Sequence, residues 1–155
     1  MSWNELHRRQ RVVQAVLGEI AESGLPVIPA GRRAELDAEF GGFDGFLREV
    51  QFRWYRAFDA RLDAVLEEDP ADVHAALVRL WHELAAVMPA ARLLLDACTG
   101  HPALAELDDH HRGRLYQATG VRLDPGRIPA AHQAPRHRRM PRWCPLFAAR
   151  GAATA

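Results

Sequence analysis

Cysteine and histidine are the residues of this chain whose chemistry suits a bound metal ion. Cys98 and His101 stand three positions apart at an expected helix end, a spacing that two ligands of one ion can have. His137 and Cys144 could complete a tetrahedral zinc site, although they lack the close spacing of zinc ribbons and fingers. The alternative, which we favour, makes Cys98 a small buried thiol, because it follows Leu94 by one helical turn. We therefore expect no metal ion and no cofactor.

His111 is the histidine placed most directly on a buried helix face. It belongs to an apolar stripe at helical spacing, which consists of Leu104, Leu107, His111, Leu115 and Ala118. A histidine in such a stripe is usually a core residue with a hydrogen-bonded partner, and we expect this for His111. The alternative is that His111 binds a ligand or transfers a proton.

Known catalytic motifs are absent from the sequence. It has no nucleophile elbow, no phosphate-binding loop, no dinucleotide-binding glycine pattern and no His-Glu-x-x-His. The Glu-x-x-His pairs of di-metal bundles are also missing, and only five residues are serine or threonine. The sequence therefore predicts a non-enzymatic protein. The alternative is a helical-bundle metal- or cofactor-binding protein, or an enzyme, that uses buried histidines.

Charge divides the chain into two parts. Residues 1–124 contain 14 arginines and all 20 acidic residues, a net charge of −6, whereas residues 125–155 contain six arginines and no acid. The chain has no lysine, and its two parts cancel to a net charge of zero. This pattern predicts a helical domain at 1–124 and a basic tail, rich in proline and arginine, at 125–155.

The tail combines positive charge with aromatic side chains. Its prolines interrupt any helix at short intervals, so we expect an extended arm. The residues expected to bind a partner are Arg136, Arg138, Arg139, Arg142, Trp143 and Phe147. Three partners are compatible with them: the acidic domain of the same chain or of a second copy, a nucleic acid, and an acidic protein.

Apolar residues recur at helical spacing along most of residues 1–124. Helices are expected at residues 2–24, 43–68, 73–88, 90–98 and 102–118, with a short one between 31 and 40. The expected fold class is all-α, a single helical-bundle domain of five or six helices with an extended basic C-terminal arm. No apolar run approaches the roughly 20 residues of a membrane span, and the N-terminus lacks the apolar stretch of a signal peptide. We therefore expect a cytoplasmic protein that does not contact a membrane.

Two aromatic residues fall on the second side of the expected helix at 43–68. Phe52 and Tyr55 lie opposite its main apolar stripe, at about 100° per residue. Leaving both side chains in water would be unfavourable. We therefore expect a homodimer that covers them, or coverage by the tail residues Trp143, Leu146 and Phe147.

Several segments between residues 8 and 98 are similar to TetR-family transcriptional regulators. Arg8 to Gly24 resembles the first helix of that family. Phe40-Gly-Gly-Phe-Asp-Gly-Phe-Leu47 is similar to the junction through which the family enters its long fourth helix. Asp69-Pro70 and Met88-Pro-Ala-Ala-Arg-Leu-Leu-Leu95 stand where the family places helix breaks.

This resemblance implies a dimerising helical body around an apolar pocket that takes an apolar small ligand. The candidate pocket residues are Trp54, Phe58, Trp81 and His111. Between Gly24 and Phe40 the chain is about one helix too short for a complete helix-turn-helix, and Phe43 stands where the family usually has a phosphate-contacting lysine. The expected function is therefore a regulatory or protein-interaction domain with a TetR-like body and without a complete DNA-reading head.

Overall fold

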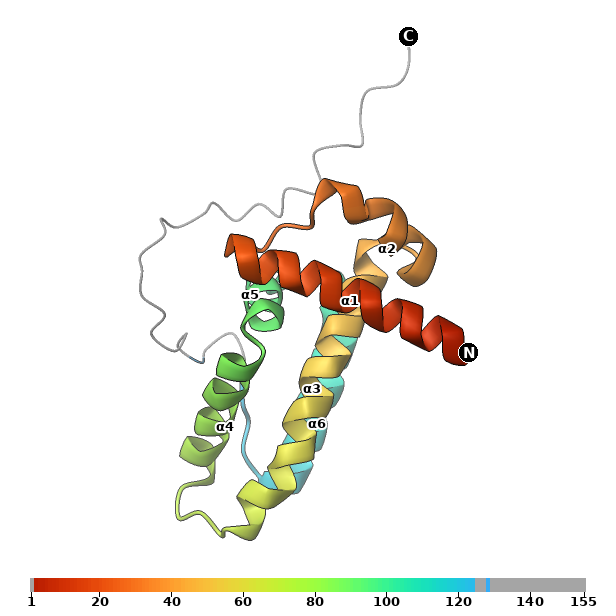
Figure 1. Cartoon of the computed structure of the whole chain (residues 1–155). Coiled ribbons are helices and arrows are strands. Elements are labelled where there is room, and N and C mark those ends of the chain that lie inside the picture. The colour runs from red at the N-terminus through yellow and green to blue at the C-terminus, as the bar shows by residue number, and fades with distance from the viewer. Residues whose placement is uncertain (1, 125–127, 129–155) are drawn as a thin grey trace.

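A computed structural model describes residues 2–124 and residue 128 of the chain. These residues form six α-helices and one short 3₁₀ helix and contain no strand, which confirms the expected all-α fold. The elements are α1 (Trp3–Ser23), η1 (Ala30–Arg32), α2 (Arg33–Phe40), α3 (Phe43–Glu67), α4 (Val73–Val87), α5 (Pro89–Ala97) and α6 (Pro102–Thr119) (Figure 1).

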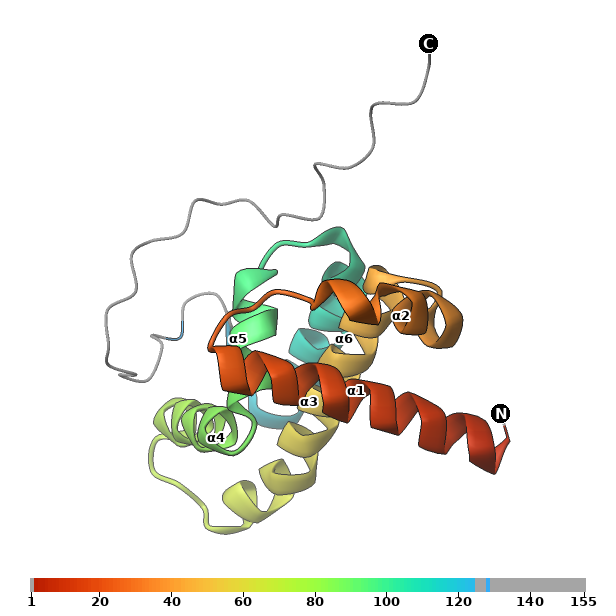
Figure 2. The ribbon, with the colours of Figure 1, turned by 45° about the horizontal axis from the view of Figure 1, so that its top comes forward.

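The long helix α3 is the centre of the bundle. It packs against α2, α4, α5 and α6, and α6 lies beside it in two views (Figure 1, Figure 2). The buried residues of α3 are Phe46, Leu47, Val50, Gln51, Trp54, Tyr55, Phe58 and Leu62. Because these residues follow helical spacing on two adjoining faces, α3 can contact several helices at once.

Helix α1 lies across one end of the bundle and extends beyond it. Ser2 and Glu5 form the expected capping box, in which Ser2 Oγ accepts from the Glu5 amide (3.3 Å) and Glu5 Oε2 accepts from the Ser2 amide (2.5 Å). The helix ends at Gly24, whose φ of 66° is left-handed. Its buried residues, Val13, Val16 and Ile20, lie from the middle of the helix onward. The N-terminal turns protrude past the other helices (Figure 2).

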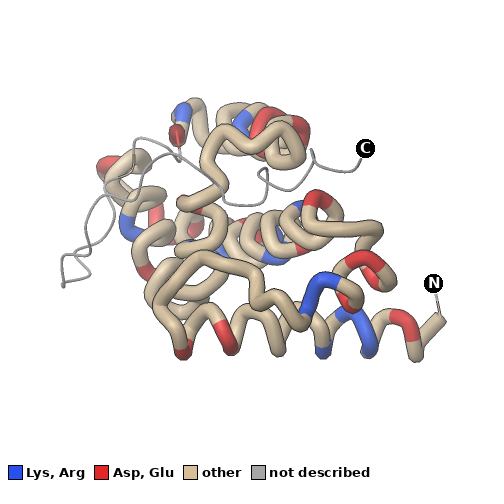
Figure 3. The backbone as a smooth tube through the Cα atoms, turned by 90° about the horizontal axis from the view of Figure 1, so that it is seen from above, with Lys and Arg blue, Asp and Glu red and all other residues tan. Residues whose placement is uncertain are grey.

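Helix α1 carries charges of both signs along its length, beginning with Glu5 in its first turn. After Glu5, its N-terminal half carries Arg8, Arg9 and Arg11, and Glu19 and Glu22 lie near its C-terminal end. Figure 3 shows blue and red stretches along this helix. Several of these side chains pair with other elements: Arg8 with Glu39 (3.0 Å), Arg9 with Glu49 (3.5 Å) and Glu19 with Arg32 (2.7 Å). Exposed pairs of this kind contribute about 0.2–1 kcal/mol each, so they mainly orient α1 on its neighbours.

A tight turn of glycines joins α2 to α3. Gly41 and Gly42 have φ values of 69° and 110°, which other residues rarely adopt. Gly45, one turn into this junction, approaches the backbone closely, since a Cβ there would lie 1.9 Å from the carbonyl oxygen of Phe40. The Phe40 ring packs edge-to-face against Phe46, with ring centroids 5.5 Å apart. The turn thus holds α2 against the first part of α3.

The later helices begin at capping residues. The Asp72 carboxylate accepts from the Ala75 amide (2.9 Å) at the start of α4. Pro89 occupies the first position of α5, where its missing amide hydrogen is not needed. His101 caps α6, because its Nδ1 accepts from the Ala103 amide (3.2 Å).

The chain turns back along the bundle after α6. Gly120 ends the helix in a left-handed conformation, and residues 121–124 follow with Leu123 buried. Ile128 is half-buried against the core. The rest of the predicted tail, residues 125–127 and 129–155, lies outside the described residues. None of the helices in the described part is both long and apolar enough to cross a membrane.

Phe52 and Tyr55, which we expected a partner or the tail to cover, have different surroundings. Tyr55 is 6% exposed, because α6 of the same chain covers it and His111 stacks on its ring. Phe52 is 52% exposed. The prediction of an external cover therefore applies to Phe52 alone.

Candidate functional site

A row of polar contacts crosses the interface between α3 and α6. Asp108 of α6 accepts hydrogen bonds from the Tyr55 hydroxyl (2.5 Å) and from Gln51 Nε2 (2.6 Å). Gln51 Nε2 also donates to the carbonyl of Leu104 (3.0 Å). Burial, together with the bond to Asp108, raises the pKa of the Tyr55 phenol, so Tyr55 keeps its proton and is the hydrogen-bond donor to Asp108.

His111 continues this row next to Tyr55. Its ring is stacked on Tyr55 with centroids 3.8 Å apart, and its Nε2 lies 3.0 Å from Asp59 Oδ1. Because an ionised carboxylate only accepts hydrogen bonds, Nε2 carries the proton. Burial lowers the pKa of His111, although the Asp59 carboxylate acts in the opposite direction. The prediction that His111 is a core histidine with a hydrogen-bonded partner is confirmed.

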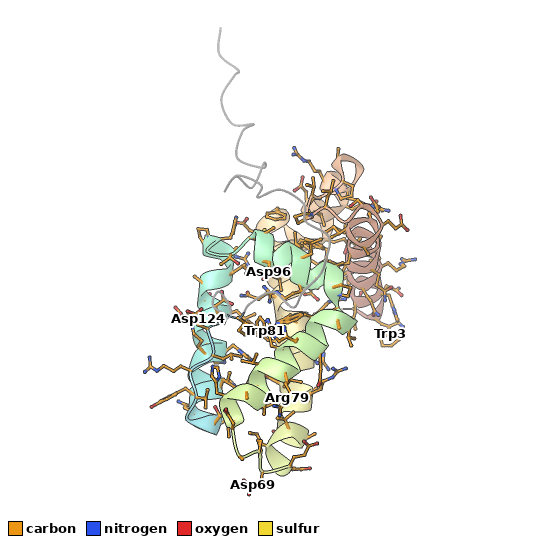
Figure 4. All side chains as sticks on the ribbon, turned by 90° about the vertical axis from the view of Figure 1, so that its left-hand side faces the viewer. Trp3, Asp69, Arg79, Trp81, Asp96 and Asp124 are labelled. Atoms are coloured by element: carbon orange, nitrogen blue, oxygen red, sulfur yellow. The ribbon has the colours of Figure 1, made fainter. Side chains whose placement is uncertain are left out.

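A cavity of about 240 Å³ lies beside the polar row, between α3, α5 and α6. Its wall includes Gln51 and Trp54 from α3, Arg92 and Leu95 from α5, and Asp108 and Arg112 from α6. Asp124 also lines it, so the segment that follows α6 reaches this cavity. In Figure 4 the labels Asp96 and Asp124 mark the α5 and post-α6 segments of this region.

Among the described residues, two buried side-chain polar atoms of α3 have no hydrogen-bond partner. They are Gln51 Oε1 and Trp54 Nε1, in side chains that are 2% and 0% exposed. The orientation of the Gln51 amide is settled by its other end, because Leu104 and Asp108 offer only acceptors and so require the nitrogen. An unpaired buried group costs about 1–3 kcal/mol. Within the described part, the interior of the bundle therefore contains one acceptor and one donor on α3 that no hydrogen bond satisfies.

Arg92 carries a charge that is already neutralised within the fold. Its guanidinium lies 4.9 Å from the ring centroids of both Trp54 and Trp81, and its side chain is 12% exposed. Nε and Nη2 both contact Asp96 Oδ1, at 2.9 and 2.8 Å. Each contact with an aromatic face stabilises such a cation by about 0.5–2 kcal/mol. Arg92 thus holds α5 against the two tryptophans.

A second hollow is a surface groove of about 600 Å³ between α1, α3, α6 and the end of α2. Its apolar residues include Phe40, Phe52 and Leu107, and its charged residues are Arg9, Arg48, Glu49 and Glu106. We call it the Phe52 groove.

The protruding end of α1 begins next to this groove, because Arg9 belongs to both. Trp3 and Leu6, here called the α1 tip, are 72% and 44% exposed. Figure 4 places Trp3 at the margin of the molecule, away from the central Trp81. The α1 tip and Phe52 are therefore uncovered apolar side chains in neighbouring parts of the surface.

The four residues of the expected apolar pocket contact one another. Trp54 and Phe58 both pack edge-to-face against Trp81, at 5.1 and 6.0 Å, and Phe58 meets His111 at 5.5 Å. Of the four, Trp54 lines the 240 Å³ cavity. All four are buried, so together they form an aromatic cluster in the core.

The residues of the zinc hypothesis have separate surroundings where they are described. Cys98 is 4% exposed, as expected for a buried thiol, and His101 uses Nδ1 as the cap of α6. His137 and Cys144 lie outside the described residues, as do the expected partner-binding residues Arg136, Arg138, Arg139, Arg142, Trp143 and Phe147. Within the described part, no three residues among His, Cys, Asp and Glu are grouped as metal ligands.

Gln51, Asp59, Arg92 and Asp108 were not among the predicted site residues. The sequence holds a signal for Gln51 and Asp59. Together with Tyr55 they are spaced four residues apart, so the three share one side of α3. That side was interpreted as aromatic, although two of its three members are polar. The spacing alone does not indicate that α6 supplies the partners.

The similarity of residues 8–98 to TetR-family regulators stays a prediction. Between α1 and α3 the chain forms η1 and a single α-helix, α2, of eight residues. Comparison with known proteins adds no family. No protein-family model, no curated protein and no solved structure matches the chain.

Proposed function

We propose that the chain is a non-enzymatic helical interaction domain of a regulatory type, with a TetR-like body that lacks a complete DNA-reading head, and that it acts as a homodimer. One observation carries this proposal. Leu6, Val13 and Ile20 follow each other at seven-residue intervals on α1, yet Val13 and Ile20 are buried and Leu6 is exposed. The apolar face of α1 therefore continues past the body that covers it. An exposed face of this kind is typical of a contact surface.

The Phe52 groove is a suitable counterpart for the α1 tip. It combines an apolar floor with charges of both signs, as the core and rim of a protein interface do. In a twofold dimer the tip of each copy lies in the groove of the other, which covers Trp3 and Phe52 twice. A buried aromatic side chain removes about 150–250 Å² from water, so the four rings contribute a large part of a stable interface.

The basic tail adds an electrostatic contact in this proposal. The charge of −6 on residues 1–124 and +6 on residues 125–155 supports binding of the tail to the acidic domain, in the same chain or across the dimer. A nucleic acid and an acidic protein are the other two partners that the tail would accept. Two cysteines are too few for a disulfide framework, which fits a cytoplasmic location.

Light scattering of the full chain over a wide range of concentration tests the dimer. We expect a dimer for the parent protein and monomers for Trp3→Glu and Phe52→Glu, because each places a charge in the interface. Val87→Glu is the matched control, since Val87 is 61% exposed on α4, away from the groove. A monomeric parent protein, or a dimer that Val87→Glu disrupts and Phe52→Glu does not, contradicts the proposal.

A full-length variant with glutamine in place of Arg136, Arg138, Arg139 and Arg142 tests the tail. We expect the parent dimer to weaken with salt and the variant to be less sensitive to salt. Labelled DNA, titrated at two salt concentrations, tests the nucleic-acid alternative. Binding of DNA by the parent, with a log–log salt slope of about −0.7 to −0.9 per phosphate, would assign the tail to nucleic acid instead.

A further inference from the structure

We propose that the arginine-rich segment 136–142 of the tail docks in a groove with an acidic rim between α3 and α6, in its own copy or in the second copy of the proposed dimer. This inference rests on the contact between tail and domain in the proposed function, and it names the surface that makes the contact. The groove has a volume of about 460 Å³ and is lined by Asp59, Leu62 and Asp63 of α3 and by Arg114, Leu115 and the last turn of α6. We call it the Asp63 groove.

The negative charge of the domain is concentrated next to this groove. Residues 59–72 contain six acidic residues and one arginine, a net charge of −5. The rest of residues 1–124 contains 14 acidic residues and 13 arginines, a net charge of −1. The end of α3 and the turn that leads to α4 therefore account for five of the six excess negative charges of the domain.

Most of these acidic side chains have no ionic partner within the described part of the chain. Asp59 pairs with Arg114 (3.3 Å), and Asp72 caps α4. The unpaired ones are Asp63, Glu67, Glu68 and Asp69. The last turn of α3 has no basic residue, although the carbonyl end of a helix favours cations. A cation bound there would relieve the repulsion among the carboxylates and their repulsion by the helix end.

Arginine side chains suit both the walls and the rim of the Asp63 groove. Leu62 and Leu115 give the groove apolar surface, and Asp63 lies at its acidic side. The carbon chain of an arginine can lie on apolar surface while its guanidinium pairs with a carboxylate through two parallel hydrogen bonds. Residues 136–142 contain four arginines and no acid, so their charge complements that of the groove.

The tail begins close enough to reach this groove. Asp124 and Tyr55 line the same cavity, and Figure 4 shows Asp124 part of the way along the molecule and Asp69 at its end. Tyr55 and Glu67 are twelve residues apart on α3, about 18 Å along the helix axis. Arg136 follows Asp124 by twelve residues, which can span up to about 40 Å. The segment can therefore reach the Asp63 groove of its own copy.

A spin label on Cys144, two residues after Arg142, tests the docking in the full-length protein labelled with ¹⁵N. Cys98 is 4% exposed, so the label should react at Cys144, and the variant Cys144→Ser should take up none. The label broadens the amide resonances of residues that lie near it. At low salt we expect a loss of intensity for residues 62–69 and 114–118, and none for residues 30–40 at the other end of the bundle.

Two double variants test whether the charges cause this contact. Asp63→Asn with Glu67→Gln should remove the loss of intensity, because both carboxylates are gone. Glu22→Gln with Glu83→Gln is the matched control and should retain it, since both residues are exposed, have no ion pair in the described part and lie outside residues 59–72. Salt at about 1 M should remove it from the parent protein, because charges are then screened beyond about 3 Å. If the first variant does not fold, the comparison of low and high salt decides.

Three results would overturn the inference. If no described residue loses intensity, the tail docks nowhere on the domain, as expected for a tail that binds a nucleic acid or an acidic protein. A loss around Phe52 and Leu107 instead places the tail in the Phe52 groove. A loss at the Asp63 groove that persists in the acid variant and in about 1 M salt means a contact that does not depend on charge.

Light scattering measures the dimer separately from this docking. A docked tail on a monomeric protein would contradict the dimer and leave the docking intact. A dimer whose tail gives no loss of intensity at the Asp63 groove would contradict the docking alone.

Discussion

Gly45→Ala tests the junction between α2 and α3 most directly. The new Cβ would lie 1.9 Å from the carbonyl oxygen of Phe40 and 3.0 Å from its carbonyl carbon. Both are backbone atoms, so no change of side-chain rotamer relieves the overlap. The two helices must separate, which weakens the packing of Phe40 against Phe46. Overpacking of this kind costs about 1–3 kcal/mol, and the higher helix propensity of alanine offsets at most about 1 kcal/mol.

Gly18→Ala is the matched control for this substitution. Gly18 lies within α1, and a Cβ there would meet no atom within 4 Å. The same change of residue should therefore stabilise the protein by about 0.5–1 kcal/mol. Urea unfolding at fixed protein concentration, followed by circular dichroism, measures both variants. If Gly45→Ala is as stable as Gly18→Ala, the close approach of α2 and α3 is wrong.

Three further substitutions or conditions have expected effects on the free energy of unfolding, each measurable in urea. Trp54→Ala should cost about 3–5 kcal/mol because Trp54 is fully buried. Phe52→Ala should cost clearly less, because within one copy Phe52 is 52% exposed and only the proposed dimer covers its ring; equal losses would contradict the assigned faces of α3. Burial lowers the pKa of His111 from 6.5, so as the pH falls the unfolded chain binds this proton before the folded chain does. The free energy of unfolding should therefore decrease as the pH drops from about 6.5 towards the folded pKa, and this decrease should be smaller in His111→Leu. An unchanged pH profile in that variant would assign the pH dependence to other groups. Asp72→Ala removes the cap of α4 and should cost about 1 kcal/mol, while no loss would mean that the cap bond to Ala75 contributes little.

Helix boundaries were predictable because their signals are local. Gly24 and Gly120 end α1 and α6 in left-handed conformations, and Asp72 and Pro89 mark the starts of α4 and α5. Each of these effects depends on the residue itself and on its immediate neighbours. The buried positions of Trp54 and His111 were predictable for a similar reason, since both lie within apolar stripes at helical spacing.

Pairings between helices were not predictable from spacing. Gln51 and Asp108 are 57 residues apart, and their bond depends on how α6 is rotated against α3. The same rotation determines that Tyr55 is buried and Phe52 is not, although the sequence pattern predicts both on one face of α3. Periodicity reports that a face is apolar, but it does not report which helix covers that face. The 240 Å³ cavity could not be predicted from the sequence either, because three helices form its wall.

The polar row between α3 and α6 explains how these two helices find one alignment. Apolar contact is not directional, so a helix packed only by leucine can slide or rotate at small cost. Hydrogen bonds from Gln51 and Tyr55 to Asp108, and between His111 and Asp59, are directional and lie on successive turns of α3. A shift of α6 by one turn would leave these buried groups unpaired, at about 1–3 kcal/mol for each group.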